Sequence, residues 1–374
     1  MMNHFLKIAV PGVQQLKPYL PGKPVEELER ELGISNIIKL ASNENPLGPS
    51  KKALASAQSV ISSVNFYPDG SGYKLRAALA EMHGVANSCI TLGNGSNDVL
   101  EIIARVFLGP DYSAVFSEYA FAVYPIVTQA VGAQARIARA FPANHPDMPY
   151  GHDLESISKQ VNKTTRVVFL ANPNNPTGTW LDKSQLEIFI SSIPSDVIVV
   201  LDEAYYEYMP DATKPDTDSW LGKYPNLIVT RTFSKIFGLA GLRVGYAISH
   251  PDVADLLNRI RQPFNVNLVA QAAALEALKD YEHITNSINL NTAGLEQLRT
   301  GLHDLKLSFI PSIGNFLTVD MGCDASIIYN KLLLQGVIVR PVANYNLPNH
   351  LRITVGTEDQ NNRVLSALEN CMHD

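Results

Sequence analysis

The central part of this chain alternates short apolar runs with longer segments of helical periodicity, and this alternation constrains the fold more than any other feature. Residues 196–201 are apolar except for the first, a pattern typical of a strand buried on both faces of a parallel sheet. Residues 88–92, 114–116 and 166–170 are further strand candidates. Apolar side chains recur at helical spacing over residues 99–107. The order of these elements predicts an α/β fold with a mostly parallel, doubly wound sheet.

The last hundred residues have a different organisation. Helical patterns cover residues 295–305, 327–334 and 358–372, and strand patterns cover residues 316–321, 337–340 and 351–355. Strands and helices mixed in this way predict a smaller α+β domain after the long sheet. A chain of 374 residues is long enough for two such domains sharing one core.

Three prolines, Pro18, Pro21 and Pro24, interrupt an N-terminal arm that has little regular pattern, and we expect the arm to lie across another surface. The glutamates within residues 26–31 are expected to form a solvated helix face. We divide the chain into three parts: an N-terminal arm with part of the small domain (residues 1–44), a large domain (residues 45–264) and a small C-terminal domain (residues 265–374).

Charge and cysteine usage exclude several classes of protein. The formal net charge is −6 and there is no basic run, so nucleic acid is not an expected partner. No apolar stretch approaches a membrane span, and the N-terminus lacks the pattern of a signal peptide. The three cysteines are widely separated, so we expect no metal site, no disulfide framework and a cytoplasmic location. The nine histidines need no catalytic role, and three of them are expected in loops or at the surface: His83, His145 and His152.

Polar residues follow three of the predicted strands at the point where each strand ends. Asn175 comes after the strand at residues 167–170, and Asp202 comes directly after the apolar run. Ser234 and Lys235 follow a strand-like run at residues 226–229. In open α/β sheets, ligands bind in the crevice outside the carboxyl ends of the strands. The sequence therefore predicts that these side chains share one site.

Lys235 has the most informative setting of these residues. Burial disfavours the ammonium form of a lysine, and an amine with a lowered pKa can form a Schiff base with a carbonyl cofactor. Upstream, Gly93-Asn94-Gly95-Ser96 opens a helix for which Ser96 or Asn97 is a plausible cap, and a helix start of this kind suits an anion. Taken singly, these features also fit a surface lysine, a turn and a helix cap. Their shared order along the chain favours one catalytic site.

This set of groups is the one that pyridoxal phosphate catalysis needs. A lysine holds the cofactor aldehyde, and an acid pairs with the pyridine nitrogen. The carboxylate keeps that nitrogen protonated because an opposite charge favours the protonated form, and the ring becomes a stronger electron sink. An asparagine or tyrosine can bind the ring hydroxyl, while a helix start, hydroxyl groups and an arginine can bind the phosphate.

The motifs at these positions resemble those of fold-type I, class II aminotransferases. They are Asn174-Asn175-Pro176-Thr177-Gly178, Asp202-Glu203-Ala204-Tyr205, and Thr232-Phe233-Ser234-Lys235 through Gly241-Leu242-Arg243-Val244-Gly245. Residues 42–50, 67–70 and 351–356 narrow the resemblance to the histidinol-phosphate aminotransferase family. The likeness runs from about residue 17 to the C-terminus. It implies that the large domain, residues 45–264, binds pyridoxal phosphate.

The resemblance implies a role for each matching residue. Lys235 forms the Schiff base and then acts as general base, and Asp202 pairs with the pyridinium nitrogen. Asn175 and Tyr205 bind the ring hydroxyl, so that Lys235, Asp202 and Tyr205 are the implied catalytic residues. The cofactor phosphate is held by five residues: Gly95, Ser96, Asn97, Ser234 and Arg243.

The resemblance also implies a homodimer acting on small molecules. Tyr67 reaches the phosphate of the neighbouring subunit's cofactor, and Tyr19 covers the other subunit's substrate. Arg352 takes the carboxylate of glutamate or 2-oxoglutarate, and Arg352 and Arg340 face the substrate phosphate in the other half-reaction. Asn45 is a further candidate substrate ligand. The implied reaction converts L-histidinol phosphate and 2-oxoglutarate into imidazole acetol phosphate and L-glutamate, in histidine biosynthesis.

The chain departs from this family where an aromatic ring stacks on the cofactor. The family commonly has Tyr-x-x-Tyr there, whereas residues 119–124 are Tyr-Ala-Phe-Ala-Val-Tyr. We align Phe121 with the stacking position, and Tyr119 is the alternative. The lost hydroxyl leaves an aromatic amino-acid aminotransferase as the nearest rival, followed by a phosphothreonine-type decarboxylase. A cofactor-sensing transcription regulator is disfavoured, because the aminotransferase motifs begin by Asn43 and the charge is acidic.

Overall fold

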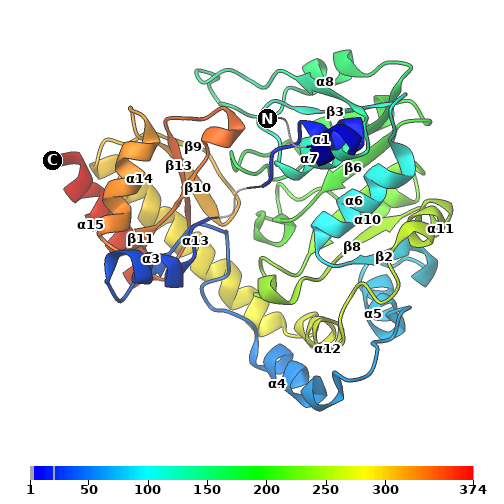
Figure 1. The fold of residues 1–374 in the computed structure, drawn as a ribbon, viewed down its shortest axis with the longest axis horizontal. Helices are drawn as coiled ribbons and strands as arrows, with labels where there is room; N and C mark the ends of the chain where they lie inside the picture. Colours follow the sequence, from blue (N-terminus) through cyan, green and yellow to red (C-terminus); the bar gives the residue numbers. More distant parts are fainter. Residues whose placement is uncertain (1–3, 20–21, 374) are drawn as a thin grey trace.

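A seven-stranded sheet forms the centre of the larger part of the computed structural model, which describes residues 4–19 and 22–373 (Figure 1). The strand order is β2-β8-β7-β6-β5-β3-β4. β8 runs antiparallel to both of its neighbours, whereas the other pairs are parallel. The strands are β2 Ile90–Gly93, β3 Ser113–Ser117, β4 Gln134–Ala138, β5 Thr165–Ala171, β6 Ile198–Asp202, β7 Leu227–Thr232 and β8 Gly245–Ser249.

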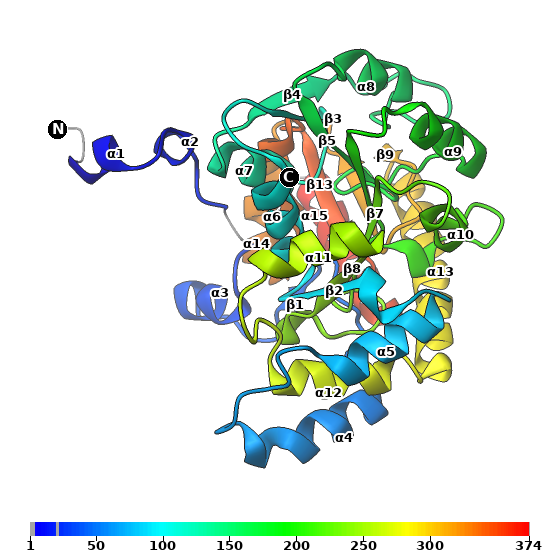
Figure 2. The same cartoon turned by 90° about the vertical axis from the view of Figure 1, so that its right-hand side faces the viewer.

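Helices cover both faces of this sheet, which confirms the predicted doubly wound α/β fold. Within β6, Ile198 and Val200 join one core cluster while Val199 and Leu201 join the other, so the strand is buried on both sides. Figure 2 shows α6 and α7 on one side of the strands and α9 and α10 on the other. The helices of this part are α4 Lys51–Val60, α5 Tyr73–Met82, α6 Ser96–Phe107, α7 Val123–Ala130, α8 Leu154–Gln160, α9 Lys183–Ser192, α10 Thr217–Leu221, α11 Pro251–Ile260 and α12 Leu268–Ala277.

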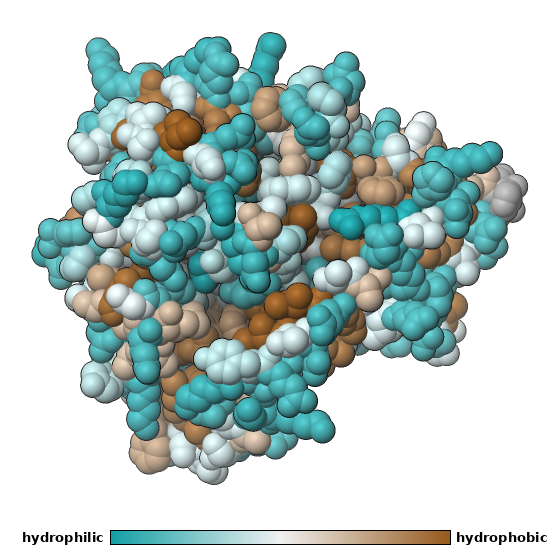
Figure 3. Space-filling model, turned by 180° about the vertical axis from the view of Figure 1, so that it is seen from behind, coloured by the Kyte–Doolittle hydropathy of each residue, from teal (hydrophilic) through white to brown (hydrophobic). Residues whose placement is uncertain are grey.

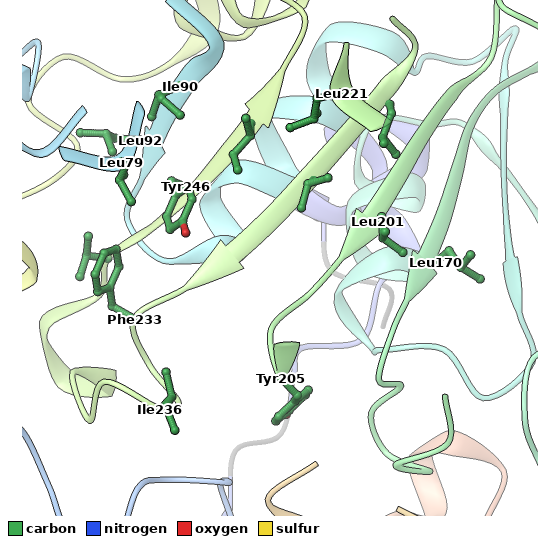
Figure 4. Packing of buried hydrophobic residues seen from close by; sticks show 14 of the residues in the cluster. Leu79, Ile90, Leu92, Leu170, Leu201, Tyr205, Leu221, Phe233, Ile236 and Tyr246 are labelled. Atoms are coloured by element: carbon green, nitrogen blue, oxygen red, sulfur yellow. The ribbon is translucent and has the colours of Figure 1, made fainter. Parts of the chain in front are cut away.

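The close view of the core shows how the sheet leads to its carboxyl edge. Leu170 and Leu201 come from the neighbouring strands β5 and β6, and Tyr205 lies just beyond the end of β6 (Figure 4). Phe233 and Tyr246 belong to the same core cluster, and their ring centroids lie 5.8 Å apart. Rigid strands of this kind fix the positions of the side chains that follow them.

The smaller part is built on an antiparallel sheet of order β12-β13-β10-β9, with helices beside it. Its elements are β9 Phe309–Ile310, β10 Phe316–Asp320, β12 Arg340–Pro341, β13 His350–Thr354, α13 Tyr281–Asp304, α14 Ala325–Leu334 and α15 Glu358–His373. The single strand expected over residues 337–340 is wrong. β11 (Val337–Ile338) pairs in parallel with β1 (Ile38–Lys39), and the chain then changes sheets, because β12 pairs with β13.

The long helix α13 contacts both parts of the molecule (Figure 1). Ile284 and Ile288, near its start, pack on the core of the large sheet, whereas Leu298 and Leu302, near its end, are buried in the core of the small one. α12 packs against α4. We propose the same three-part division of the chain, with boundaries after residues 44 and 264, although α12 follows the second boundary and packs on the core of the large sheet. Within the described residues, no helix is long and apolar enough to cross a membrane.

The N-terminal arm contains helices, so the expectation of little regular pattern there is wrong. These helices are α1 His4–Ile8, α2 Pro11–Gln14 and α3 Val25–Leu32. Pro11 and Pro24 stand at helix starts, where a missing N–H costs nothing. α3 buries Leu28 and exposes its glutamates, as the charge pattern predicted. Pro21 lies outside the described residues. Short 3₁₀ helices are η1 Ile61–Ser63, η2 Asn87–Cys89, η3 Tyr206–Tyr208, η4 Ala240–Leu242 and η5 Ala343–Tyr345.

Of the histidines expected in loops or at the surface, His83 and His152 lie outside the helices and strands but are buried. His83 Nδ1 lies 2.8 Å from an Asp218 carboxylate oxygen, and its Nε2 lies 3.0 Å from the Tyr246 hydroxyl. His152 Nε2 lies 3.0 Å from the carbonyl oxygen of Ala171, and burial lowers its pKa to about 4. Both rings are accommodated because a polar partner meets them inside the fold.

Candidate active site

A cavity of about 250 Å³ opens at the carboxyl ends of β5, β6 and β7. Ala171, Asp202 and Thr232 from the ends of these strands line it. Its other walls come from the N-terminal segment at residues 41–44 and from the small sheet. The structure therefore brings together, in one cavity, the strand-end side chains that the sequence predicted to share a site.

Lys235 points its amine at a backbone carbonyl rather than at a carboxylate. Nζ donates to the Ser42 carbonyl oxygen at 3.0 Å and lies 5.9 Å from the centroid of the Tyr205 ring. Burial, with the nearby Arg352 charge, lowers the pKa of the Lys235 amine from 10.5 to about 7. This lowered pKa makes the neutral, nucleophilic form of the amine accessible near pH 7.

Asp202 is a buried carboxylate that has one free oxygen. Oδ2 accepts a hydrogen bond of 2.8 Å from the Tyr124 hydroxyl, whereas Oδ1 is buried without a hydrogen-bond partner among the described residues. Burial raises the pKa of Asp202 above 3.8, and the Tyr124 hydrogen bond opposes that rise. A cation placed at Oδ1 would satisfy this oxygen and restore the charged form. Sequence reasoning missed Tyr124, whose only signal was its place in the Phe-x-x-Tyr pattern.

Asn175 and Tyr205 lie together on the side of the small sheet. The Asn175 side-chain oxygen accepts a hydrogen bond of 2.5 Å from Arg352 Nη1, and the Tyr205 hydroxyl accepts one of 2.9 Å from Asn43 Nδ2. Burial raises the pKa of Tyr205 to about 12, so its hydroxyl keeps its proton and remains a donor. Asn43 is a cavity residue that sequence reasoning did not assign, although it falls in the motif at residues 42–50.

The start of α6 forms a cradle for an anion. Gly95 takes φ +84°, and a Cβ added there would lie 2.4 Å from Arg243 Nη2, so only glycine lets this guanidinium come so close. Ser96 and Asn97 are the first residues of α6, and both line the cavity with Ser234 and Arg243. The expected side-chain cap is wrong: Gly95 is the N-cap and no side chain closes the helix. The helix start thus remains available to a ligand phosphate.

Two arginines stand opposite each other across the antiparallel strands β12 and β13. Arg340 pairs in register with Arg352, both side chains are buried, and both line the cavity. Burial is the main cause of a lowered pKa of Arg352, and the Arg340 charge adds to it. Like charges directly opposite each other are destabilising, so this arrangement favours an anion between them. Arg352 Nε is also buried without a hydrogen-bond partner among the described residues, which again favours an anion at this position.

Phe121 and Tyr119, the two candidates for the ring that stacks on the cofactor, have different surroundings in the structure. Phe121 lines the cavity, whereas Tyr119 packs edge-on against Tyr150, with ring centroids 5.3 Å apart, and is not in the lining. The ring at the predicted stacking position therefore carries no hydroxyl. Tyr19 lines the cavity of its own chain, with the Arg340 guanidinium carbon 5.5 Å from its ring centroid.

The structure does not bring Asn45 or Tyr67 into the lining of this cavity. The Asn45 amide instead donates to the Ile236 carbonyl oxygen at 2.8 Å and to Ser287 Oγ at 2.9 Å. Asn43, two residues earlier, faces the cavity in its place. Tyr67 is 82% exposed and stacks on Phe264 at the surface, with ring centroids 4.7 Å apart.

The chemistry of these residues fits pyridoxal phosphate. A neutral amine suits the aldehyde, a buried carboxylate oxygen without a partner suits a protonated pyridine nitrogen, and the Gly95 cradle suits a phosphate. The three groups lie on separate elements around one cavity, as a cofactor with three different binding groups requires.

Comparison with known proteins leads to the same chemistry. A family model described as aminotransferase class I and II matches residues 35–368. The chain belongs to this family. The aminotransferase is 57% identical to histidinol-phosphate aminotransferase 2 of Pseudomonas fluorescens over 98% of both chains. It is 54% identical to the protein of the same name from Pseudomonas aeruginosa, again over 98% of each chain.

Solved structures place the aminotransferase in fold-type I. Histidinol-phosphate aminotransferase from Sinorhizobium meliloti, crystallised in complex with pyridoxal-5'-phosphate, superposes with a TM-score of 0.88 at 29% identity. The match covers 97% of both chains. An aspartate aminotransferase from Thermus thermophilus shares the fold with a TM-score of 0.82 at 20% identity, over 97% of this chain and 99% of the other.

Proposed function

We propose that this aminotransferase uses pyridoxal phosphate to move the amino group of L-histidinol phosphate to 2-oxoglutarate. The products are imidazole acetol phosphate and L-glutamate, and the step belongs to histidine biosynthesis. The observation that carries the proposal is the buried pair Arg340 and Arg352 on facing strands. Both substrates bear an anion, a phosphate or a carboxylate, away from the reacting carbon, and paired guanidinium groups bind either one. The names of the most similar relatives support the same substrate.

The residues divide the work between binding and proton transfer. Bound pyridoxal phosphate supplies the electron sink that acidifies the Cα–H bond of the substrate. Lys235 would hold the cofactor aldehyde and would take and return the substrate proton, which its pKa of about 7 allows near neutral pH. Asp202 keeps its negative charge toward the pyridine nitrogen, with Tyr124 orienting the carboxylate. Asn175 and Tyr205, which also line the cavity, would bind the ring hydroxyl.

A second candidate is an aromatic amino-acid aminotransferase, and Phe121 is the observation that favours it. An apolar ring lines the cavity where the family commonly has a tyrosine. The change removes a polar group that a phosphorylated substrate or cofactor could use, and leaves an apolar wall that accepts an aromatic side chain.

A substrate comparison tests the assignment. We expect kcat/KM for L-histidinol phosphate to exceed that for L-phenylalanine by about 100-fold, because only the former uses both guanidinium groups. In the Arg340→Ala variant, kcat/KM for L-histidinol phosphate should fall by about 10- to 100-fold, while the value for L-phenylalanine changes little. Steady-state kinetics with 2-oxoglutarate as acceptor measures both. A preference for phenylalanine, or an equal loss with both donors, would contradict the assignment.

We also propose a homodimer in which Tyr67 completes the site of the neighbouring subunit. Phe66, Tyr67 and Phe264 expose their rings together, and Leu54 lines an apolar hollow of about 220 Å³ next to Leu242. Figure 3 shows apolar side chains gathered in the lower half of the face opposite Figure 1, the half in which α4 and α12 lie. Soluble monomers rarely leave such surface uncovered.

Light scattering should therefore report twice the chain mass of 41.0 kDa. Tyr67→Ala should weaken cofactor binding while the dimer persists, because its ring is 82% exposed within its own chain and stacks on Phe264 at the surface. A monomer of full activity would rule the dimer out.

We propose a cytoplasmic location for the enzyme. Within the described residues Cys89, Cys323 and Cys371 form no disulfide, which suits a reducing compartment. A biosynthetic reaction that consumes 2-oxoglutarate is consistent with this location.

A further inference from the structure

Four hydrogen bonds made by Asn43 join the N-terminal segment to the small sheet and to Tyr205. The Asn43 backbone N–H donates to Thr354 Oγ1 at 2.9 Å, and the Thr354 hydroxyl donates to Asn43 Oδ1 at 3.1 Å. The Asn43 amide nitrogen then donates to the Tyr205 hydroxyl at 2.9 Å. Asn315 Nδ2 donates to the Asn43 carbonyl oxygen at 3.0 Å. All four residues are buried, so water does not compete for these bonds.

The backbone of Asn43 is held in the left-handed region, with φ 55°. Asparagine tolerates this region better than most residues, and the bonds from Thr354 and Asn315 hold it there. Such a conformation at a site, maintained by the surrounding structure, is a common mark of functional positioning. Here it places one side-chain amide between a threonine and a tyrosine.

The bond from the Asn43 backbone N–H to Thr354 Oγ1 decides which group is donor and which is acceptor in the bonds that follow. A backbone N–H can only donate, so Thr354 Oγ1 accepts from Asn43, and the single hydrogen of the threonine hydroxyl is left for Asn43 Oδ1. With Oδ1 facing Thr354, the NH₂ group must face Tyr205. The opposite amide orientation would leave the threonine hydrogen without an acceptor among the described residues. The Tyr205 oxygen is therefore an acceptor toward Asn43.

The consequence concerns the hydrogen of the Tyr205 hydroxyl. Because its oxygen accepts from Asn43 and makes no other hydrogen bond among the described residues, its own hydrogen is free to be donated. Tyr205 lines the cavity, so a ligand acceptor is the partner left to it. We propose that Asn43 and Thr354 are positioning residues that turn Tyr205 into an obligate donor toward the ring hydroxyl oxygen of the cofactor. The inference rests on the proposed use of pyridoxal phosphate and adds how the donor is oriented.

A hydrogen-bond donor directed at the ring hydroxyl oxygen stabilises the ionised form of that oxygen. The bound cofactor therefore loses its proton at a lower pH. The test follows the visible absorption band of the cofactor-loaded enzyme through a pH titration. In the Thr354→Val variant, which keeps the side-chain shape, we expect the midpoint to rise by roughly one pH unit, a tenfold change. Asn43→Ala should shift it in the same direction, and Thr354→Ser, which restores the hydroxyl, should return it to the wild-type value.

The Tyr205→Phe background separates positioning from general damage. If Asn43 and Thr354 act through the tyrosine, then adding Thr354→Val to Tyr205→Phe should leave the midpoint unchanged. Thermal melting of the cofactor-free proteins checks that each variant is folded, and Thr354→Val remains informative even if Asn43→Ala fails to fold. A wild-type midpoint in Thr354→Val, or a further shift in the Tyr205→Phe background, would overturn the inference. A wild-type protein that forms no band with pyridoxal phosphate would instead overturn the proposed function.

Discussion

Replacing Lys235 with alanine is expected to lower the transamination rate by about 10⁴-fold or more. The change removes both the amine that holds the cofactor aldehyde and the base that moves the substrate proton. The environment of this residue supports so large an effect, since burial lowers its pKa to about 7 and its amine faces the Ser42 carbonyl oxygen. Steady-state rates measure the loss, and borohydride reduction with mass spectrometry should find the cofactor attached at Lys235 only in the unmodified enzyme.

A lysine elsewhere in the fold provides the matched control. Lys331 in α14 is also partly buried and donates to a backbone carbonyl oxygen, that of Cys371, at 3.2 Å. Lys331→Ala should retain nearly full activity and the reducible adduct. If Lys235→Ala turned over within tenfold of the unmodified enzyme, or if the adduct mapped to another lysine, the assignment of Lys235 would be wrong.

Asp202→Asn is expected to have the second largest effect, a loss of about 10²- to 10⁴-fold in kcat. Removing one charge of a buried pair costs about 3–5 kcal/mol, and here the partner is the protonated pyridine nitrogen. Tyr124→Phe removes only the hydrogen bond to Oδ2 and should cost about tenfold. Asp320→Asn, at the end of β10, is a suitable control because its Oδ1 accepts from the Gly322 N–H, a bond that asparagine can also form.

The Asp202→Asn substitution should also stabilise the cofactor-free protein at neutral pH. Because burial raises the folded-state pKa of Asp202 above 3.8, the folded protein binds this proton more tightly than the unfolded chain. The resulting stabilisation is present below pH 3.8 and is lost as the pH rises through the folded pKa, so ionisation of the buried carboxyl opposes folding at higher pH. Asparagine carries no such charge, so its melting temperature should exceed that of the unmodified protein. A lower melting temperature with unchanged kcat would contradict the role given to Asp202.

Most of the large sheet was predictable from the sequence because its inner strands are buried on both faces, whereas the largely exposed edge strand β4 was not predicted. In β6, consecutive residues enter opposite cores, and this requires a run of apolar side chains that no surface strand would contain. The small sheet was harder. Residues 337–339 form a short apolar run followed by Arg340, and the chain changes from one sheet to the other within these four residues. The apolar pattern does not show which strand each residue pairs with.

The site was predictable where function requires one residue type after a strand. Asp202, Asn175 and Lys235 stand at such positions, and the structure brings them to one cavity. Tyr124 was not predictable, because its partner Asp202 is distant in sequence and an apolar helix face explains its position equally well. The cross-strand pairing of Arg340 with Arg352 depends on register, which the sequence does not display.

The buried histidines show the limit of arguments from residue type. His83 and His152 are polar and were expected in loops or at the surface, but both are buried, and each finds a hydrogen-bond partner that only the tertiary fold supplies. Burial of a polar side chain costs little once it is hydrogen-bonded. Such partners come from elements far apart in the chain, so local composition cannot reveal them.

Helix α13 has a thermodynamic consequence for the whole molecule. Its first half is anchored by Ile284 and Ile288 in one hydrophobic core, and its second half by Leu298 and Leu302 in the other. Because a helix forms cooperatively, unfolding of either core would also unwind the half of α13 that packs on the other core. Gly294, near the middle, lies so close to Val355 that an added Cβ would sit 2.4 Å from Cγ1. We therefore expect the two parts of the chain to unfold in a single transition, as one cooperative unit.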